Sequence, residues 1–300
     1  MKALELIPQI ALRNILFATD FEVSASRALP FALALAGRYG AKLCAAYVVP
    51  PDTYALARPE SVERILKQIQ DYSTYSLNLI VDLAKHRGLL SEALLGEGDV
   101  AEVLMEFVRT HAADLVVVGT TSRAGWDKVV LGSVAEEVIR ESPCPVLTVG
   151  PHVTTLASAG FHSVVCATDF SPASLRAVEF AMSLACEYEA HITLVHVREG
   201  SRRDSTRLAI QQDENRLREL IPPEPELGYR PEVVVGTGSV AERILDVAAD
   251  FSADFIVMGV RGAGAFAQTA SRFGSIAHRV VALASCPVVT TGDLQNFNDD

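Results

Sequence analysis

The chain has 300 residues, a length that favours two domains, and 49% of them are hydrophobic, which is enough to build cores. Its formal net charge of -11 argues against general nucleic-acid binding, which needs a basic face. No apolar run approaches the roughly 18 residues that span a membrane, and Glu5 and Pro8 interrupt the stretch that a signal peptide would occupy. We therefore expect a cytoplasmic protein with neither a membrane nor a nucleic acid as partner.

Strand-like and helix-like segments alternate along the first half of the chain. We expect strands near 14–19, 42–48, 92–95, 114–119 and 145–149, and helices near 24–39, 61–87, 100–111 and 133–141. This alternation is typical of a parallel sheet with right-handed crossovers.

The pattern then repeats. The segment NILFATDF, which contains Asp20, returns as SVVCATDF, which contains Asp169, at an offset of 149 residues. Later segments match at offsets of 140 and 142 residues. A period this long indicates two domains rather than a solenoid. We place the domains at 1–150 and 161–292, with a linker at 151–160 and a tail at 293–300.

A loop with glycines follows the fourth strand of each copy. In the first copy it runs from Gly119 through Ser122 to Gly132-Ser133, where helical spacing begins and where we place Ser133 as the helix cap. In the second copy Gly259, Gly262 and Gly274-Ser275 take these places. Backbone amides at such a turn and helix start favour an anion, so phosphate is the first ligand to consider. Neither loop has the GxxxxGK[ST] signature of a P-loop.

The spacing of both loops resembles Gly-x2-Gly-x9-Gly-Ser/Thr, the nucleotide loop of the universal stress protein family. Ser122 replaces the second glycine in the first copy, and the second copy has two additional residues. The resemblance covers nearly the whole chain, twice. It implies an α/β fold of two tandem doubly wound domains, each with a five-stranded parallel sheet in the order 3-2-1-4-5, like the adenine nucleotide alpha hydrolases.

The same resemblance implies a cytoplasmic stress-response protein that binds ATP or a related adenine nucleotide, with or without magnesium. Asp20 and Asp169 would contact the adenosine, the backbones of Val48 and Val197 the adenine, and the loops the phosphates. The implied nucleotide-binding residues are Ala18, Thr19, Asp20, Val48, Gly119, Ser122, Gly132, Ser133 and Val134 in the first copy, and Ala167, Thr168, Asp169, Val197, Gly259, Gly262, Gly274, Ser275 and Ile276 in the second.

Several of these residues also have simpler interpretations. Asp20 and Asp169 could cap the helices that follow them, and loop arginines are usually solvated. The Gly-x-Gly stretches at Gly96 and Gly236 indicate tight strand-to-helix turns rather than a dinucleotide fingerprint. The five cysteines form no CxxC pair and indicate buried free thiols, and the histidine spacing does not favour a metal site.

The two loops should differ in phosphate binding. The first keeps the family length, so we expect it to be marginally the better site, although Ser122 would cost about 1 kcal/mol if its φ is positive. Beyond Asp20 no second acid maps to the pocket, so we expect no catalytic residue and slow or absent ATP hydrolysis.

Two alternatives of other classes stay open. One is a ligand-free interaction module whose loops are structural, and the other is an adenylating or pyrophosphatase-type enzyme. In the family, equivalent last strands pair between subunits. The segments 145–149 and 287–291 would then make the chain an internal pseudo-dimer, which could also form a homodimer or bind unidentified proteins.

Overall fold

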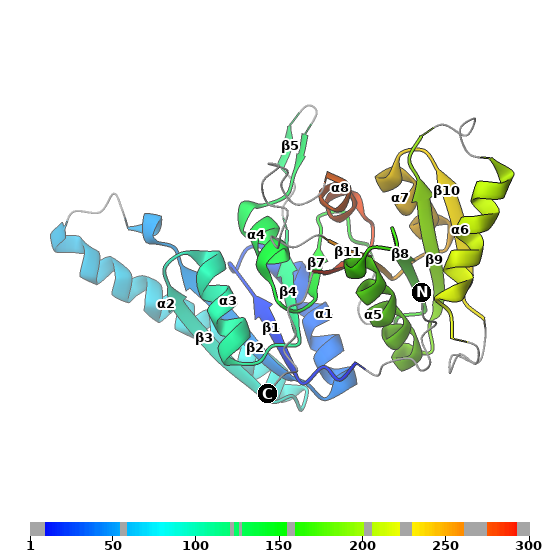
Figure 1. The fold of residues 1–300 in the computed structure, drawn as a ribbon. Coiled ribbons are helices and arrows are strands. Elements are labelled where there is room, and N and C mark those ends of the chain that lie inside the picture. The colour runs from blue at the N-terminus through cyan, green and yellow to red at the C-terminus, as the bar shows by residue number, and fades with distance from the viewer. Residues whose placement is uncertain are drawn as a thin grey trace. The chain divides into compact units, whose positions relative to one another are not determined.

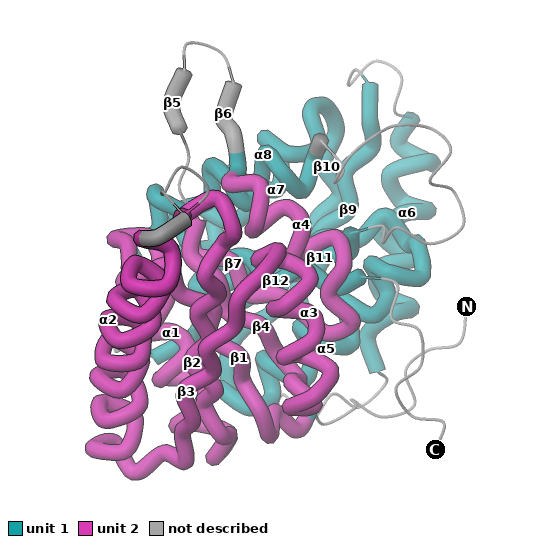
Figure 2. Tube along the Cα trace, turned by 90° about the vertical axis from the view of Figure 1, so that its left-hand side faces the viewer, with its two compact units in different colours: residues 1–10, 122–131, 150–300 teal, residues 11–121, 132–149 magenta. Residues whose placement is uncertain are grey.

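The computed structural model describes residues 10–54, 59–120, 123–125, 128–154, 160–200, 206–222, 230–260 and 275–292. The chain divides into two compact units (Figure 2). The N-terminal unit comprises residues 11–121 and 132–149, and the C-terminal unit comprises residues 1–10, 122–131 and 150–300. Most of the loop that follows the fourth strand therefore belongs to the C-terminal unit.

The N-terminal unit is a parallel sheet of β1 (Asn14–Ala18), β2 (Lys42–Val49), β3 (Ser91–Glu97), β4 (Leu115–Gly119) and β7 (Val146–Val149). The strand order is β3-β2-β1-β4-β7, so the expected order 3-2-1-4-5 is confirmed. Strand β4 is a continuous run of apolar residues because both faces of a doubly wound sheet are covered.

Helices cover both faces of this sheet (Figure 1). Helices α1 (Val23–Tyr39) and α2 (Pro59–His86) lie on one face, and α3 (Val100–Thr110) and α4 (Ser133–Glu141) on the other. A short 3-10 helix, η1 (Pro51–Thr53), follows β2. The crossovers change face between β1 and β4, which is the switch point where ligands bind in such sheets.

The C-terminal unit repeats this arrangement. Its parallel strands are β8 (Ser163–Ala167), β9 (His191–Arg198), β10 (Glu232–Thr237), β11 (Phe255–Gly259) and β12 (Val288–Thr291), in the order β10-β9-β8-β11-β12. Its helices are α5 (Pro172–Tyr188), α6 (Arg207–Glu219), α7 (Val240–Asp250) and α8 (Ser275–Leu283).

Helix starts agree with the sequence in one copy and not in the other. Ser171 caps α5, and Pro172, a residue type that favours the first helical position, follows it. The expectation that Ser133 caps α4 is wrong: Gly132 is the cap, with φ -59° and ψ 139°, and Ser133 is the first helical residue. Glycine is tolerated as a cap because the cap residue need not be helical.

The loop after β4 contains an element that the sequence did not indicate. Strands β5 (Arg123–Gly125) and β6 (Lys128–Val130) form an antiparallel hairpin. Just after the hairpin, Leu131 is 2% exposed, and its amide donates to His278 Nε2 of α8 at 3.1 Å. The expected phosphate contact at Ser122 lies outside the described residues. This hydrogen bond lies within the C-terminal unit, to which residues 122–131 belong.

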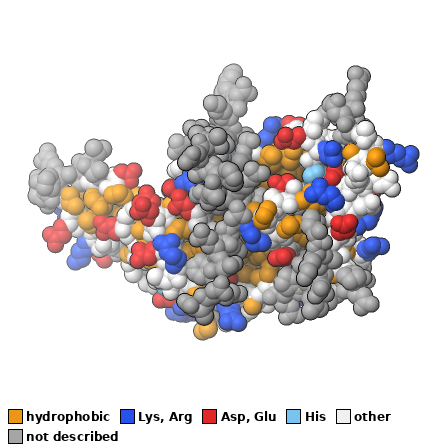
Figure 3. Space-filling view, in the orientation of Figure 1, with side chains coloured by type: hydrophobic (Ala, Val, Ile, Leu, Met, Phe, Trp, Pro, Cys, Tyr) orange, Lys and Arg blue, Asp and Glu red, His pale blue; other side chains and the backbone are white. Residues whose placement is uncertain are grey.

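Helix α2 carries two apolar faces. Leu77, Val81 and Ala84 are buried against the sheet, whereas the opposite side of the helix exposes Tyr72 (63%), Tyr75 (64%), Leu79 (54%) and Leu83 (41%). Hydrophobic side chains are also visible along the projecting part of α2 (Figure 3). Among the described residues, no helix is long and apolar enough to cross a membrane.

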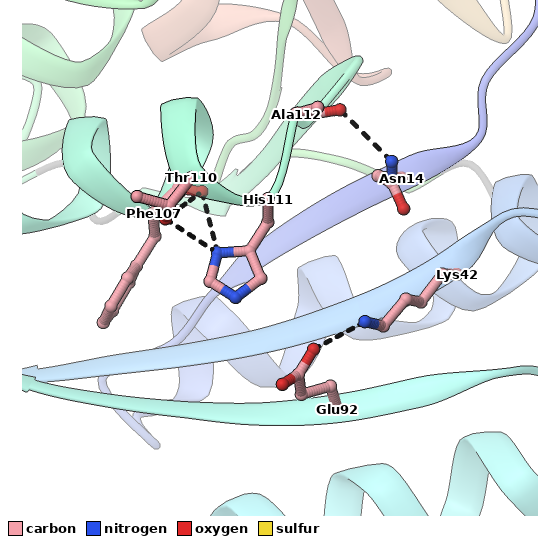
Figure 4. A network of polar contacts seen from close by, with 7 residues as sticks. All are labelled: Asn14, Lys42, Glu92, Phe107, Thr110, His111 and Ala112. Carbon is pink, nitrogen blue, oxygen red and sulfur yellow. Dashed lines mark hydrogen bonds and ion pairs between the residues drawn. The ribbon is translucent and has the colours of Figure 1, made fainter.

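Two polar contacts lie at the amino-terminal ends of the strands, one between β2 and β3 and one between β1 and the segment before β4 (Figure 4). Lys42 Nζ of β2 donates to Glu92 Oε2 of β3 at 2.6 Å, and Asn14 Nδ2 donates to the carbonyl oxygen of Ala112 at 3.3 Å. The hydrogen bond between Lys42 and Glu92 raises the pKa of Lys42 and lowers that of Glu92. Because ligands bind at the opposite, carboxyl end of such sheets, this network is structural.

Candidate functional site

A cavity of about 440 Å³ lies at the carboxyl ends of β1, β2 and β4 in the N-terminal unit. This volume falls within the range of small-molecule sites, roughly 300–1,000 Å³. The cavity occupies the switch point between β1 and β4. It is lined by Ala18, Thr19, Asp20, Glu22, Ser24, Ala25, Ala46, Tyr47, Val48, Pro50, Val100, Leu104, Val118, Gly119, Thr120, Gly132, Ser133, Val134 and Ala135.

The fold brings most of the residues expected in the first copy to this cavity. Those that line it are Ala18, Thr19, Asp20, Val48, Gly119, Gly132, Ser133 and Val134. Sequence reasoning missed Val100 and Leu104, whose spacing of four residues places them on one face of α3. It also missed Glu22, so the expectation of no second acid is wrong. The signal was available, because Glu22 follows Asp20 at the end of a strand.

The turn after β1 is held by two side chains. Thr19 Oγ1 accepts from the amide of Phe21 at 3.0 Å, and Asp20 Oδ1 accepts from the amide of Glu22 at 2.9 Å. These bonds support Phe21 at φ 61°, a left-handed conformation that is uncommon for an aromatic residue. Glu22 is itself the cap of α1, so Asp20 shapes the turn rather than capping the first helical amides. Such strained residues cluster at functional sites.

Aromatic rings pack beside this turn. The Phe21 ring centroid lies 4.7 Å from that of Tyr47 and 6.1 Å from that of Tyr72. Burial, and next the nearby charge of Asp20, raise the pKa of Tyr47. Tyr47 is one of the residues that line the cavity, and its phenol is neutral at neutral pH.

The two motif glycines that line the cavity, Gly119 and Gly132, differ in whether packing requires a glycine at that position. A Cβ added to Gly119 would lie 2.2 Å from the backbone oxygen of Ser24, so any side chain there would separate β4 from α1. Gly259 is similarly constrained, because its added Cβ would lie 2.4 Å from the amide nitrogen of Ser174. A Cβ added to Gly132 would meet nothing within 4 Å, and its φ is negative. The fold therefore requires Gly119 and Gly259 but does not require Gly132.

The electrostatics of the cavity depend on backbone groups. Its lining includes the carboxylates of Asp20 and Glu22 but no lysine, arginine or histidine from the described residues. The first residues of α4 line the cavity, so the positive end of the helix dipole lies there. The cap of α4 makes no side-chain hydrogen bond that would occupy the first amides. An anionic group would be held there mainly by backbone amides. Within the described part of the chain, no group of three or more metal-ligating side chains is found.

The family model of the universal stress proteins matches residues 11–150 and again residues 160–291. The chain belongs to the universal stress protein family.

Relatives and solved structures agree with this membership. A universal stress protein of Methanocaldococcus jannaschii is 32% identical over 138 residues, which cover 46% of this chain and 81% of that protein. One from Thermus aquaticus is 32% identical over 141 residues, covering 46% of this chain and 98% of that protein. A universal stress protein structure from Archaeoglobus fulgidus has a TM-score of 0.73 at 20% identity, covering 93% of this chain and 98% of that one. This last likeness shows the fold.

A hollow of about 620 Å³ in the second universal stress protein domain lies at the starts of α7 and α8. It is lined by Glu199, Gly200, Gly238, Ser239, Val240, Ala241, Ile276 and Arg279. Of the residues expected in this copy, Ile276 lines the hollow, whereas Ala167, Thr168, Asp169, Val197 and Gly259 do not. Gly262 and Gly274 lie outside the described residues, as does the side chain of Ser275. The described site residues of the second domain are not brought together around this hollow.

Proposed function

We propose that the N-terminal unit binds ATP or a related adenine nucleotide in the 440 Å³ cavity, and that the protein acts in a stress response by binding rather than by catalysis. The observation that carries this proposal is Gly132. A glycine with negative φ and open space around its Cα has no steric reason to be glycine, and its place as the cap of α4 is worth only about 1 kcal/mol over alanine. Close approach of a ligand to the backbone is the remaining reason.

The cavity offers a distinct surface to each part of such a nucleotide. The base lies against the apolar side chains of Pro50, Val100 and Leu104 and reaches the backbone of Val48. The Asp20 carboxylate accepts from the ribose hydroxyls. The phosphates lie at the start of α4, where Ser133 and its neighbours present their amides. Magnesium, if present, arrives with the phosphates.

The test compares two glycines that the fold leaves free. ATP binding to the full chain is measured by titration calorimetry for the natural protein, Gly132→Ala and Gly37→Ala. Gly37 is an exposed residue of α1 with nothing within 4 Å of an added Cβ, and it is remote from the cavity lining. We expect Gly132→Ala to weaken ATP binding about tenfold or more, equivalent to at least about 1.4 kcal/mol. Its stability should fall by no more than about 1 kcal/mol, the cost of alanine at a cap.

Gly37→Ala should bind ATP like the natural protein. If the natural protein shows no saturable ATP binding, the ligand-free interaction module becomes the better assignment. Equal affinity in Gly132→Ala and the natural protein would remove the observation on which the proposal rests.

We expect little or no turnover of bound ATP. Phosphoryl transfer generally needs a metal-binding carboxylate, a group that orients water and a cation that stabilises the transition state. Glu22 adds a second carboxylate, but the described lining contributes no cation. Phosphate release should therefore stay well below about 1 per second, the lower end of the usual enzyme range. Faster release that Asp20→Ala abolishes would assign the protein as an enzyme.

The internal pseudo-dimer also stays a proposal. Strands β7 and β12 each come last in the strand order of their own unit, and a matching copy can cover such an edge. Solution scattering distinguishes a compact pseudo-dimer, with a radius of gyration near about 19 Å, from two separated lobes, which would give a larger value.

A further inference from the structure

Two pairs of residues occupy the same places in the two domains. At the offset of 149 residues, Thr19 corresponds to Thr168 and Ala25 corresponds to Ser174. The contacts agree with this register. An added Cβ on Gly119 would meet the amide nitrogen of Ala25 at 2.7 Å, and one on Gly259 would meet that of Ser174 at 2.4 Å. In both units the threonine directly follows the first strand, and residue 25 or 174 lies in the first helix.

In the C-terminal unit the threonine hydroxyl is fully used. Thr168 is 5% exposed, and its Oγ1 accepts from the amide of Phe170 at 3.0 Å. The same oxygen lies 2.9 Å from Ser174 Oγ, which donates its own proton to the carbonyl oxygen of Ser171 at 3.0 Å. Each hydroxyl has one proton to donate, so in the arrangement in which Ser174 donates to Ser171, the Thr168 proton goes to Ser174. In that arrangement Thr168 has no proton left for a ligand.

The N-terminal unit lacks this arrangement because Ala25 has no hydroxyl. Thr19 is half-buried, lines the cavity and accepts from the amide of Phe21 at 3.0 Å. Among the described residues, no acceptor is found for the Thr19 proton. Ala25 lines the same cavity beside it. The Thr19 hydroxyl is thus a donor held in place by its acceptor bond and available to the cavity.

Two further contacts in the C-terminal unit also occupy polar groups near the place where a ligand would bind. His196 Nδ1 lies 2.8 Å from the carbonyl oxygen of Thr168, a polar contact at the end of β8. Arg279 of α8, which lines the hollow, pairs with Glu242 of α7 at 2.8 Å. This ion pair joins the two helices whose starts would frame a ligand.

The N-terminal unit has no such bridge at the equivalent positions. Glu102 and Glu137 correspond to Glu242 and Arg279, and both are acidic. Glu137 pairs instead with Arg140 on its own helix at 3.3 Å. The gap between α3 and α4 is therefore not closed by an ion pair at these positions.

From these contacts we infer that the chain binds one nucleotide, in the N-terminal unit, where the Thr19 hydroxyl donates to an oxygen of the ligand, and that Ala25 and Ser174 decide which of the two threonines can do so. This inference rests on the proposed function, and it adds the stoichiometry and the residue that selects the domain. Thr19 is a binding residue, and Ala25 acts through it.

The experiment exchanges the selecting residues. Titration calorimetry with ATP on the full chain is expected to give one site per chain. Ala25→Ser should weaken binding several-fold to about tenfold, because the new hydroxyl engages the Thr19 proton as Ser174 engages that of Thr168. Ser174→Ala, the matched exchange in the other domain, should leave the affinity of this site unchanged.

A second pair of variants separates the hydroxyl from its methyl group. Thr19→Val keeps the shape but removes the hydroxyl, and it should weaken ATP binding about tenfold. Thr19→Ser restores the hydroxyl and should bind within about twofold of the natural protein. Thermal unfolding of each variant reports any loss of the turn at Phe21 separately from ATP affinity.

The other possible outcomes distinguish failure of this inference from failure of the proposed function. Two ATP molecules per chain, or equal affinity of Ala25→Ser and the natural protein, would overturn this inference and leave the proposed function intact. Failure of Thr19→Ser to recover the affinity lost in Thr19→Val would also overturn it. No binding by the natural protein would overturn both the inference and the proposed function.

Discussion

Gly119 at the end of β4 lies so close to Ser24 at the start of α1 that an added Cβ would come within 2.2 Å of the Ser24 carbonyl oxygen. The contact is between backbones, so no flexible side chain can move aside. This glycine thus serves the packing of a helix on a strand end, although it also lines the cavity.

Gly119→Ala should destabilise the protein by about 3 kcal/mol or more, at the upper end of overpacking costs, because backbone segments must separate. The free energy of unfolding in urea measures this. Gly37→Ala on α1 is the control and should be neutral or stabilise by up to about 1 kcal/mol, as expected for an exposed helical glycine. If both variants are equally stable, the close approach of β4 and α1 is wrong.

Asp213 of α6 should be a costly carboxylate to remove. It is 4% exposed, accepts from Arg198 and lies 3.5 Å from Arg216, whose guanidinium also covers the Phe170 ring at 3.7 Å. Asp213→Ala should cost about 2 kcal/mol, less than a fully buried pair because both arginines retain water contact.

Glu214 supplies the matched control for Asp213. It is the next residue of the same helix, and its pair with Arg218, at 3.3 Å, is exposed. Glu214→Ala should cost less than about 1 kcal/mol. Equal losses of unfolding free energy in the two variants would show that burial of Asp213 contributes nothing.

The pair of Lys42 and Glu92 should stabilise the protein only between acidic and strongly basic pH. The pKa of Glu92 is lowered by its hydrogen bond to Lys42, so its contribution is present above its unfolded pKa of about 4.3 and is lost as the pH falls through the lowered value. The pKa of Lys42 is raised, so its contribution is present below about pH 10.4 and is lost as the pH rises further.

Glu92→Gln tests this pH window. Both side chains are partly exposed, at 37% and 42%, so the loss at neutral pH should stay below about 1 kcal/mol. The difference in unfolding free energy should vanish below the folded-state pKa of Glu92. A difference that stays constant from pH 3 to 9, flanking the reference pKa of about 4.3, would contradict the assignment.

The buried thiols should resist modification in the native protein. Burial raises the pKa of Cys144 to about 11 and that of Cys286 to about 12, and it also raises that of Cys166. The reactive thiolate is therefore scarce at pH 8, below the usual thiol pKa of about 8.5. A thiol-specific reagent should label half-buried Cys186 first and the other cysteines only in urea. Equal labelling rates for all of them in the native protein would contradict this burial.

Much of the fold could be predicted because it depends on local patterns. The apolar run that contains Leu115 and the repeated Ala-Thr-Asp segments indicated parallel strands and two copies, and the observed strand orders agree. The cap at Gly132 could not be predicted, because serine is usually the better cap and a helix start can shift by one residue. The hairpin of β5 and β6 was missed because its short strands lack an alternating pattern.

The position of the candidate site could be predicted because the carboxyl ends of parallel strands meet at a switch point. Asp20 and Gly132 lie far apart in sequence, yet the parallel topology brings both to one cavity. Thr19 and Thr168 have identical sequence neighbours on both sides, so no local pattern distinguishes them. Their difference depends on residue 25 or 174 in the next helix and on where each hydroxyl proton goes.

The sequence by itself determined the class of fold, the duplication and the region of the site, since these follow from hydrophobic periodicity and from residues that recur at a constant offset. Only the tertiary structure decided that Gly119 is required by packing and Gly132 is not, and that the Ser174 hydroxyl engages Thr168. The physical reason is that steric clashes and hydrogen bonds depend on distances of a few tenths of an ångström between segments far apart in the chain.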